Sequence, residues 1–77
     1  MRQNDQPPWV RDRRRTIGRR LQDARLYANL TQEAAAEAVG VDRRTIQAWE
    51  AGTADPPLGR LLLFAAAVGV PLTDLLK

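Results

Sequence analysis

The residues in this sequence best suited to chemistry are two adjacent arginines, Arg43 and Arg44, which follow directly after Asp42. Asp42 is a favourable N-cap, so both arginines are expected in the first turn of a helix over 43–51. A cation there is unfavourable by roughly 0.3–1 kcal/mol, because the free N–H groups already create positive potential. An anionic partner would explain the placement, since arginine can pair bidentately with guanine in the major groove of DNA. The alternative is two solvated arginines on a surface helix.

Two short helices joined by a tight turn are expected to position these arginines. Thr31 suits the N-cap of a helix over 32–39, and Gly40 can end that helix at positive φ. Asp42 opens the second helix and Gly52 closes it. Neither helix could bury its apolar face alone; the face comprises Ala35, Ala36, Val39, Val41, Ile46 and Trp49. This spacing, with a short glycine-containing turn, is typical of a helix-turn-helix.

The motif resembles that of a known family, the Cro/C1-type (XRE) helix-turn-helix DNA-binding domains. The resemblance is carried by Thr31-Gln32-Glu33, Ala36, Gly40-Val41, Ile46 and Glu50-Ala51-Gly52. With the flanking helices it covers about residues 16–76. It implies an all-α fold, a compact five-helix lambda-repressor-like bundle. The departures are Ala35 in place of leucine, Asp42 in place of serine or threonine, and Ala51 in place of asparagine.

The resemblance also implies roles on DNA. The helix over 43–51 would lie in the major groove, with the helix over 32–39 crossing the backbone above it. The implied base-reading residues are Arg43, Arg44, Gln47 and Ala48. The expected phosphate contacts are Gln32, Thr31, Thr45, Thr53, Arg14 and Arg15. A structural ion pair between Arg25 and Glu50 is implied, with two unrelated surface charges as the alternative.

The remaining sequence predicts the rest of the bundle. Residues 1–12 are expected to form a flexible basic arm, ahead of a helix-turn-helix domain over 13–77. A first helix is expected over about 14–28, followed by Asn29 in a left-handed conformation. Pro56 and Pro57 predict a loop before a helix over 58–68. Its expected core stripe is Leu58, Leu61, Leu62, Ala65 and Val68. Pro71 should open a last short helix through Leu76.

Two apolar groups are candidates for contacts with other chains. Possible dimer contacts implied by the resemblance are Val70, Leu72, Leu75 and Leu76, with core packing of Leu72 and Leu75 as the alternative. Leu63 and Phe64 exceed what one side of a small bundle needs. They could close the core or form part of a partner surface on the helix over 58–68.

The composition excludes several classes of function. The chain has 77 residues, without cysteine or histidine, which removes disulfides and the commonest metal ligands and general base. No apolar run approaches the roughly 20 residues that span a bilayer, and no apolar signal segment opens the chain. We therefore expect no enzyme activity, no cofactor, no metal and no membrane partner, in a cytoplasmic (bacterial, nucleoid-associated) protein.

Charge is distributed unevenly along the chain. Residues 1–30 carry eight arginines against three aspartates, a balance of +5, whereas residues 31–77 have a balance of −2. A polyanion would therefore meet the N-terminal region and the Arg43–Arg44 pair. The expected function is sequence-specific binding of double-stranded DNA by a transcription regulator, a repressor, acting as a homodimer on an inverted repeat. The alternative is a protein-interaction module or antitoxin whose partner binds the helix over 58–68.

Overall fold

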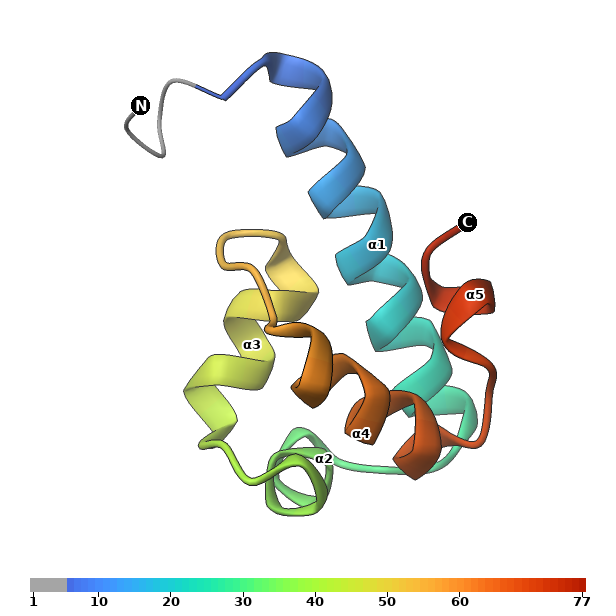
Figure 1. Ribbon diagram of the computed structural model, residues 1–77. Coiled ribbons are helices and arrows are strands. Elements are labelled where there is room, and N and C mark those ends of the chain that lie inside the picture. Colours follow the sequence, from blue (N-terminus) through green and yellow to red (C-terminus); the bar gives the residue numbers. More distant parts are fainter. Residues whose placement is uncertain (1–5) are drawn as a thin grey trace.

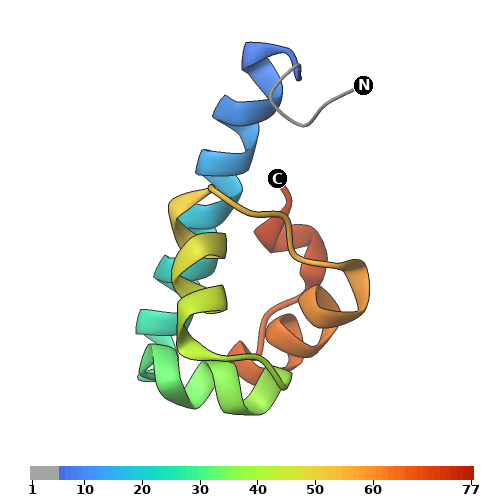
Figure 2. The ribbon, with the colours of Figure 1, turned by 90° about the vertical axis from the view of Figure 1, so that its left-hand side faces the viewer.

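Five helices account for most of the chain. The computed structural model describes residues 6–77, which contain α1 (Pro8–Tyr27), α2 (Gln32–Val39), α3 (Arg43–Ala51), α4 (Leu58–Val68) and α5 (Leu72–Leu75) (Figure 1). This part of the chain holds no strand, which confirms the expected all-α, five-helix bundle. The N-terminal turns of α1 extend beyond the body formed by the other helices (Figures 1 and 2). No helix in residues 6–77 combines the length and apolar character needed to cross a membrane.

The start of α1 corrects the expected boundary between arm and domain. The helix begins at Pro8, six residues earlier than expected, so residues 8–12 are helical. Proline suits a first helical position because its φ is already helical and its missing N–H would be unpaired there. Thr16 lies inside the helix, where its hydroxyl donates to the carbonyl oxygen of Asp12 at 3.1 Å. Residues 1–5 of the expected arm lie outside the described residues.

The bounds of α2 and α3 are those expected, and side-chain caps set them. Thr31 Oγ1 accepts a hydrogen bond from the Ala34 amide at 3.0 Å. Asp42 Oδ1 accepts one from the Thr45 amide at 2.8 Å. Each cap satisfies one of the N–H groups that a helix start leaves unpaired. Between the two helices Gly40 has a φ of 79°, a left-handed conformation that glycine adopts without strain. Asn29 is left-handed as expected, with a φ of 60°.

The core is built from one inward face of each helix. Side chains with no exposed surface come from four helices: Leu21, Ala35, Ile46 and Phe64. Partly buried residues that complete the core include Ile17, Leu30, Val41 and Leu72. Burial of such side chains is the main favourable contribution to folding, roughly 1.5–3 kcal/mol for each large one.

The register of α4 differs from the expected one. Leu58 and Leu62 are 64% and 52% exposed, whereas Phe64 is fully buried. The inward face follows Leu61, Phe64, Ala65 and Val68, which share one side of a helix through spacings of three and four. The helix is apolar on most of its circumference, so hydrophobicity alone did not identify the buried side. Phe64, the one aromatic side chain of α4, occupies the core.

Gly18 brings α1 and α3 into close contact. A Cβ atom at this position would lie 2.6 Å from the carbonyl oxygens of both Trp49 and Glu50. Real Cβ atoms do not approach backbone oxygens so closely, so only glycine fits without a shift of one helix. The C-terminal half of α3 therefore packs against the middle of α1 at backbone distance.

We expect Gly18→Ala to destabilise the protein, although alanine is the better helix former by about 1 kcal/mol. The added methyl group forces α1 and α3 apart, and overpacking of this kind costs about 1–3 kcal/mol. Urea unfolding followed by circular dichroism measures the change. Gly59→Ala is the matched control, because Gly59 also lies in a helix and a Cβ there meets nothing within 4 Å. Equal stabilities for the two variants would show that the close approach is not a constraint.

Candidate nucleic-acid interface

One face of α3 is free and carries the predicted base-reading residues. Arg43, Arg44 and Gln47 are exposed and Ala48 is half-buried, whereas Ile46, Trp49 and Glu50 on the other side are buried. The helix therefore presents its polar stripe outward on an apolar base. A stripe of this kind, on a rigid helix, is what reading of base edges in the major groove requires.

Asp42 determines how α3 begins. Its carboxylate accepts hydrogen bonds from both the Thr45 hydroxyl, at 2.7 Å, and the Thr45 amide, at 2.8 Å. These bonds, with a smaller effect of the neighbouring Arg44 charge, hold the pKa of Asp42 below its usual value. The charged cap also offsets part of the unfavourable placement of two arginines at the helix N-terminus.

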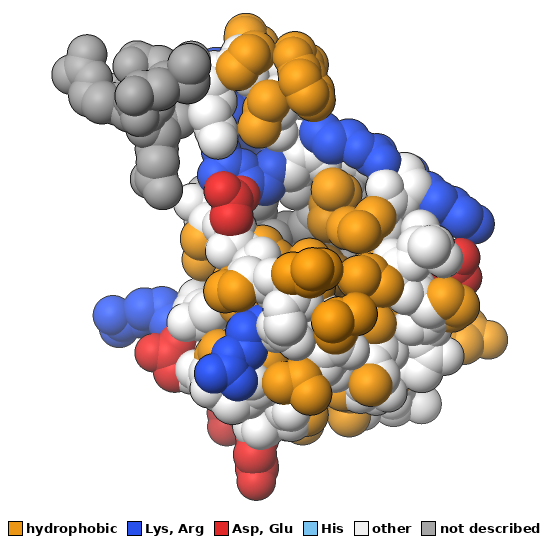
Figure 3. Space-filling view, viewed as in Figure 1, with side chains coloured by type: hydrophobic (Ala, Val, Ile, Leu, Met, Phe, Trp, Pro, Cys, Tyr) orange, Lys and Arg blue, Asp and Glu red, His pale blue; other side chains and the backbone are white. Residues whose placement is uncertain are grey.

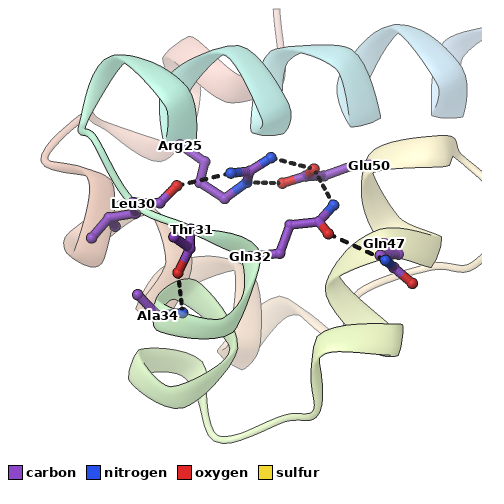
Figure 4. A network of polar contacts seen from close by, with 7 residues as sticks. All are labelled: Arg25, Leu30, Thr31, Gln32, Ala34, Gln47 and Glu50. Carbon is purple, nitrogen blue, oxygen red and sulfur yellow. Dashed lines mark hydrogen bonds and ion pairs between the residues drawn. The ribbon is translucent and has the colours of Figure 1, made fainter.

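A buried ion pair joins α1 to the end of α3. Arg25 Nε lies 2.6 Å from Glu50 Oε2, and Arg25 Nη2 donates to Glu50 Oε1 at 3.1 Å (Figure 4). Arg25 Nη1 donates to the Leu30 carbonyl oxygen at 2.8 Å, so the guanidinium also holds the α1–α2 turn. Arg25 and Glu50 are 6% and 8% exposed. The ion pair expected from the resemblance is present, and it is bidentate.

Gln32 lies between this ion pair and the exposed face of α3. Its Nε2 donates to Glu50 Oε1 at 3.1 Å, and its Oε1 accepts a hydrogen bond from Gln47 Nε2 at 3.3 Å (Figure 4). The resemblance implies a phosphate contact for Gln32 and neither of these two hydrogen bonds. The two roles are compatible, because the amide nitrogen of Gln32 carries two N–H groups and only one of them is needed for Glu50. The sequence contains no signal for the contacts to Glu50 and Gln47.

The two arginines differ in their surroundings. Arg43 Nη1 lies 3.5 Å from Glu33 Oε1, an exposed ion pair between α3 and α2. Within residues 6–77, Arg44 has no side-chain hydrogen bond or ion pair. Arg43, Thr31 and Gln32 meet around one polar hollow, which Arg25 and Glu33 complete. The structure thus brings a predicted base reader and two predicted phosphate contacts together at the start of α2.

The hydroxyls proposed for phosphates are not equivalent. Within residues 6–77, Thr31 Oγ1 only accepts a hydrogen bond, so its hydrogen is available to a phosphate. The Thr45 hydroxyl instead donates to Asp42, and the Thr53 hydroxyl donates to the Ala48 carbonyl oxygen at 3.3 Å. Both of these hydrogens are committed to the ends of α3, where a short hydroxyl side chain reaches nearby backbone or cap oxygens.

The predicted phosphate contacts on α1 also separate. Arg14 is half-buried, with Nη1 3.3 Å from Asp55 Oδ1 in the loop before α4 and Nη2 donating to Gln6 Oε1 at 3.3 Å. Arg14 thus links α1 to that loop, and its guanidinium is already paired and less available to a phosphate than an unpaired arginine would be. Arg15 is exposed, and its backbone lies against Gly52 at the end of α3.

Hydrophobic side chains gather on another surface, over α4 and the N-terminal end of α1 (Figure 3). The large exposed hydrophobic residues of these two elements are Trp9, Leu58, Leu62 and Leu63, and Leu76 after α5 is also exposed. Among the candidate dimer contacts, Leu75 is buried, and Leu72 and Val70 pack partly against the core. Leu75 is therefore unavailable to a second chain, because α5 uses it to cover the bundle. Within the described residues, no group of three or more acidic side chains is placed to hold a metal ion.

Comparison with known proteins agrees with this geometry. A family model described as "Helix-turn-helix" matches residues 21–75. The chain belongs to the Cro/C1-type (XRE) helix-turn-helix family. It is 35% identical over 58 residues to the cryptic phage CTXphi transcriptional repressor RstR of Vibrio cholerae, a match that covers 75% of this chain and 52% of that repressor. The chain thus spans about half the length of that relative.

A solved structure shows the same arrangement of helices. The restriction-modification controller protein C.AhdI from Aeromonas hydrophila superposes with a TM-score of 0.75 and 30% sequence identity, covering 79% of this chain and 92% of that chain. The members of this XRE family are DNA-binding transcription regulators. Because α3 is the second helix of the helix-turn-helix in this chain, its exposed face is the candidate nucleic-acid interface.

Removing one partner of the buried ion pair should strongly destabilise the protein. Arg25→Met leaves the Glu50 carboxylate buried without its cation, which costs about 3–5 kcal/mol, a large share of the stability of a small domain. The control is the double variant Arg25→Met/Glu50→Leu, which buries no charge and should regain most of the lost stability. Urea unfolding of both variants measures this. A loss below about 1 kcal/mol in the single variant would contradict a structural role for the pair.

The Asp42 cap should make stability depend on pH in the acid range. Because the pKa of Asp42 is lower in the folded state, the stabilisation is complete above the unfolded pKa of about 4 and is lost as pH falls through the folded value. Asp42→Ser keeps a capping oxygen without a titrating group. The advantage of the native protein over this variant in urea unfolding should shrink between pH 5 and pH 2. A constant difference would contradict the assignment.

Proposed function

We propose that this protein is a sequence-specific DNA-binding transcription regulator, a repressor, that reads the major groove with α3. The observation that carries the proposal is the pair Arg43 and Arg44, exposed in the first turn of a helix whose other side is locked into the core. Arginine forms two parallel hydrogen bonds with guanine O6 and N7, so guanine is the expected base in each half-site. The repressor name of the Vibrio cholerae relative supports the direction of regulation.

Phosphate contacts would set the register of α3 in the groove. The Thr31 hydroxyl and the second N–H of Gln32 are both available at the start of α2, beside the free amides of its first turn. Arg15 is a further candidate on α1. Glu33 lies at the same place and would repel a phosphate, but its pairing with Arg43 partly neutralises it. Arg43 must leave this exposed ion pair to reach a base, at a cost of about 1 kcal/mol or less.

A homodimer on an inverted repeat is the expected form on DNA. One such domain gives a small interface, and two-fold paired domains bind half-sites about one helical turn apart. Exposed Leu76, with Val70 at the edge of the core, provides candidate contacts. A second candidate function is a protein-interaction module, which the exposed Leu58, Leu62 and Leu63 on α4 favour.

Selection of bound sequences from a random duplex pool at two salt concentrations tests the proposal. A guanine-containing inverted repeat is the expected result. Recovery of no motif, with binding that vanishes as salt rises, would leave only phosphate attraction and overturn the proposal. A search for a protein bound to α4 would then test the second candidate function.

Arg44→Ala should lose discrimination at one base pair, by about 1–3 kcal/mol, because the variant lacks the guanidinium that would form the bidentate pair with guanine. Competition between duplexes that differ at each selected position measures it. Lys77→Ala is the control for loss of one positive charge, since Lys77 lies at the C-terminus and contacts Asp74. If Arg44→Ala weakens binding to all sequences equally, Arg44 contacts phosphate and does not read a base.

A further inference from the structure

The chain of amide contacts from Glu50 to Gln47 has a fixed direction. Both Glu50 oxygens already accept from the Arg25 guanidinium, and the carboxylate can only accept hydrogen bonds. The side of the Gln32 amide that faces Glu50 must therefore be its NH2 group, as the 3.1 Å contact from Nε2 shows. Arg25 and Glu50 are both less than a tenth exposed, and Gln32 is half-buried beside them.

This direction is passed on to Gln47. With its NH2 group on Glu50, Gln32 turns its carbonyl oxygen toward α3, and a carbonyl oxygen only accepts. Gln47 meets it with Nε2, at 3.3 Å. The carbonyl oxygen of Gln47 consequently points away from Gln32 and out of the network (Figure 4). A glutamine without such a neighbour can turn its amide over and present either a donor or an acceptor at the same place.

We propose that Gln32 is a specificity-determining residue that acts through Gln47, by fixing which end of the Gln47 amide faces the base edges. This inference deepens the proposed function and rests on it. Gln47 lies between Arg43 and Arg44 around the axis of α3, at the centre of the exposed stripe. Its outward oxygen requires a donor, and only adenine N6 and cytosine N4 provide one in the major groove.

Adenine is the base that this orientation favours. Gln47 keeps one N–H of its Nε2 after donating to Gln32, so it offers an acceptor and a donor side by side. Adenine presents the complementary N6 donor and N7 acceptor, whereas cytosine satisfies the oxygen alone. Guanine and thymine would place an acceptor against the Gln47 oxygen. The half-site should therefore contain adenine next to the guanines read by the two arginines.

The experiment begins with the position that Gln47 reads, identified as the base pair at which Gln47→Met removes a preference present in the native protein. Four duplexes that differ only there are then compared in competition. The native protein should favour adenine by at least about fivefold. Gln32→Met removes the amide at similar length and should reduce this preference to within about twofold. Preferences at the guanine positions should not change.

Gln32→Lys provides the opposite orientation. A lysine ammonium can donate to Glu50 but can only donate to Gln47, which must then turn its oxygen inward and its NH2 group outward. The preference should shift from adenine toward guanine or thymine. Gln22→Met, the same substitution at an exposed position of α1, should leave all four ratios unchanged. Circular dichroism of each variant verifies the fold.

Three results separate failure of this inference from failure of the proposed function. If Gln32→Met weakens all four duplexes equally and adenine is still favoured, Gln32 binds only phosphate and the inference is wrong. If Gln47→Met changes no preference, Gln47 reads no base and the inference is wrong as well. Neither result bears on the guanine preference expected from Arg43 and Arg44, so the proposed function would stand. If the native protein shows no preference at any position, the proposed function itself fails.

Discussion

The structure depends on a buried ion pair between α1 and α3. Arg25 and Glu50 are almost fully buried, and hydrogen bonds to Leu30 and Gln32 satisfy much of their remaining capacity. A hydrophobic pair of similar volume would often stabilise a fold as well or better, because desolvation consumes much of the Coulomb attraction. What a bidentate pair adds is direction, since the fork of arginine fits a carboxylate in one plane. Together with the backbone contact at Gly18, it fixes how α3 projects from the bundle.

That rigidity allows α3 to carry charges that do not favour its own folding. Two arginines lie at the positive end of the helix, where the Asp42 cap and the Glu33 pair partly offset them. A helix held by tertiary contacts tolerates such a placement, whereas an isolated nine-residue helix would not form. The core and the ion pair thus offset the unfavourable placement of the two arginines on α3.

Much of the fold could be predicted from the sequence, because its signals are local. Thr31, Gly40 and Asp42 act on neighbouring backbone groups, so α2 and α3 begin and end where expected. The start of α1 and the register of α4 depend on tertiary packing, and the sequence offered two or more compatible answers for each. The same holds at the site. The exposed side chains of α3 follow from its predicted bounds, but the hydrogen bonds of the Thr45 and Thr53 hydroxyls and the loop partner of Arg14 depend on tertiary structure.

The hydrogen bonds of Gln32 connect the fold to the candidate site, because they link the buried Arg25–Glu50 pair to the exposed Gln47 amide. The arginine guanidinium has only hydrogen-bond donors, so Arg43 and Arg44 present donors to a base in any rotamer. They require only enough side-chain mobility to reach the base edge. Glutamine presents a donor and an acceptor, so the bases with which it can pair depend on which end of its amide faces outward. A residue of the first kind can read from an exposed and mobile position, whereas one of the second kind requires a fixed neighbour. The contacts place such a neighbour, Gln32, beside Gln47, and the buried Arg25–Glu50 pair can set the orientation of both amides.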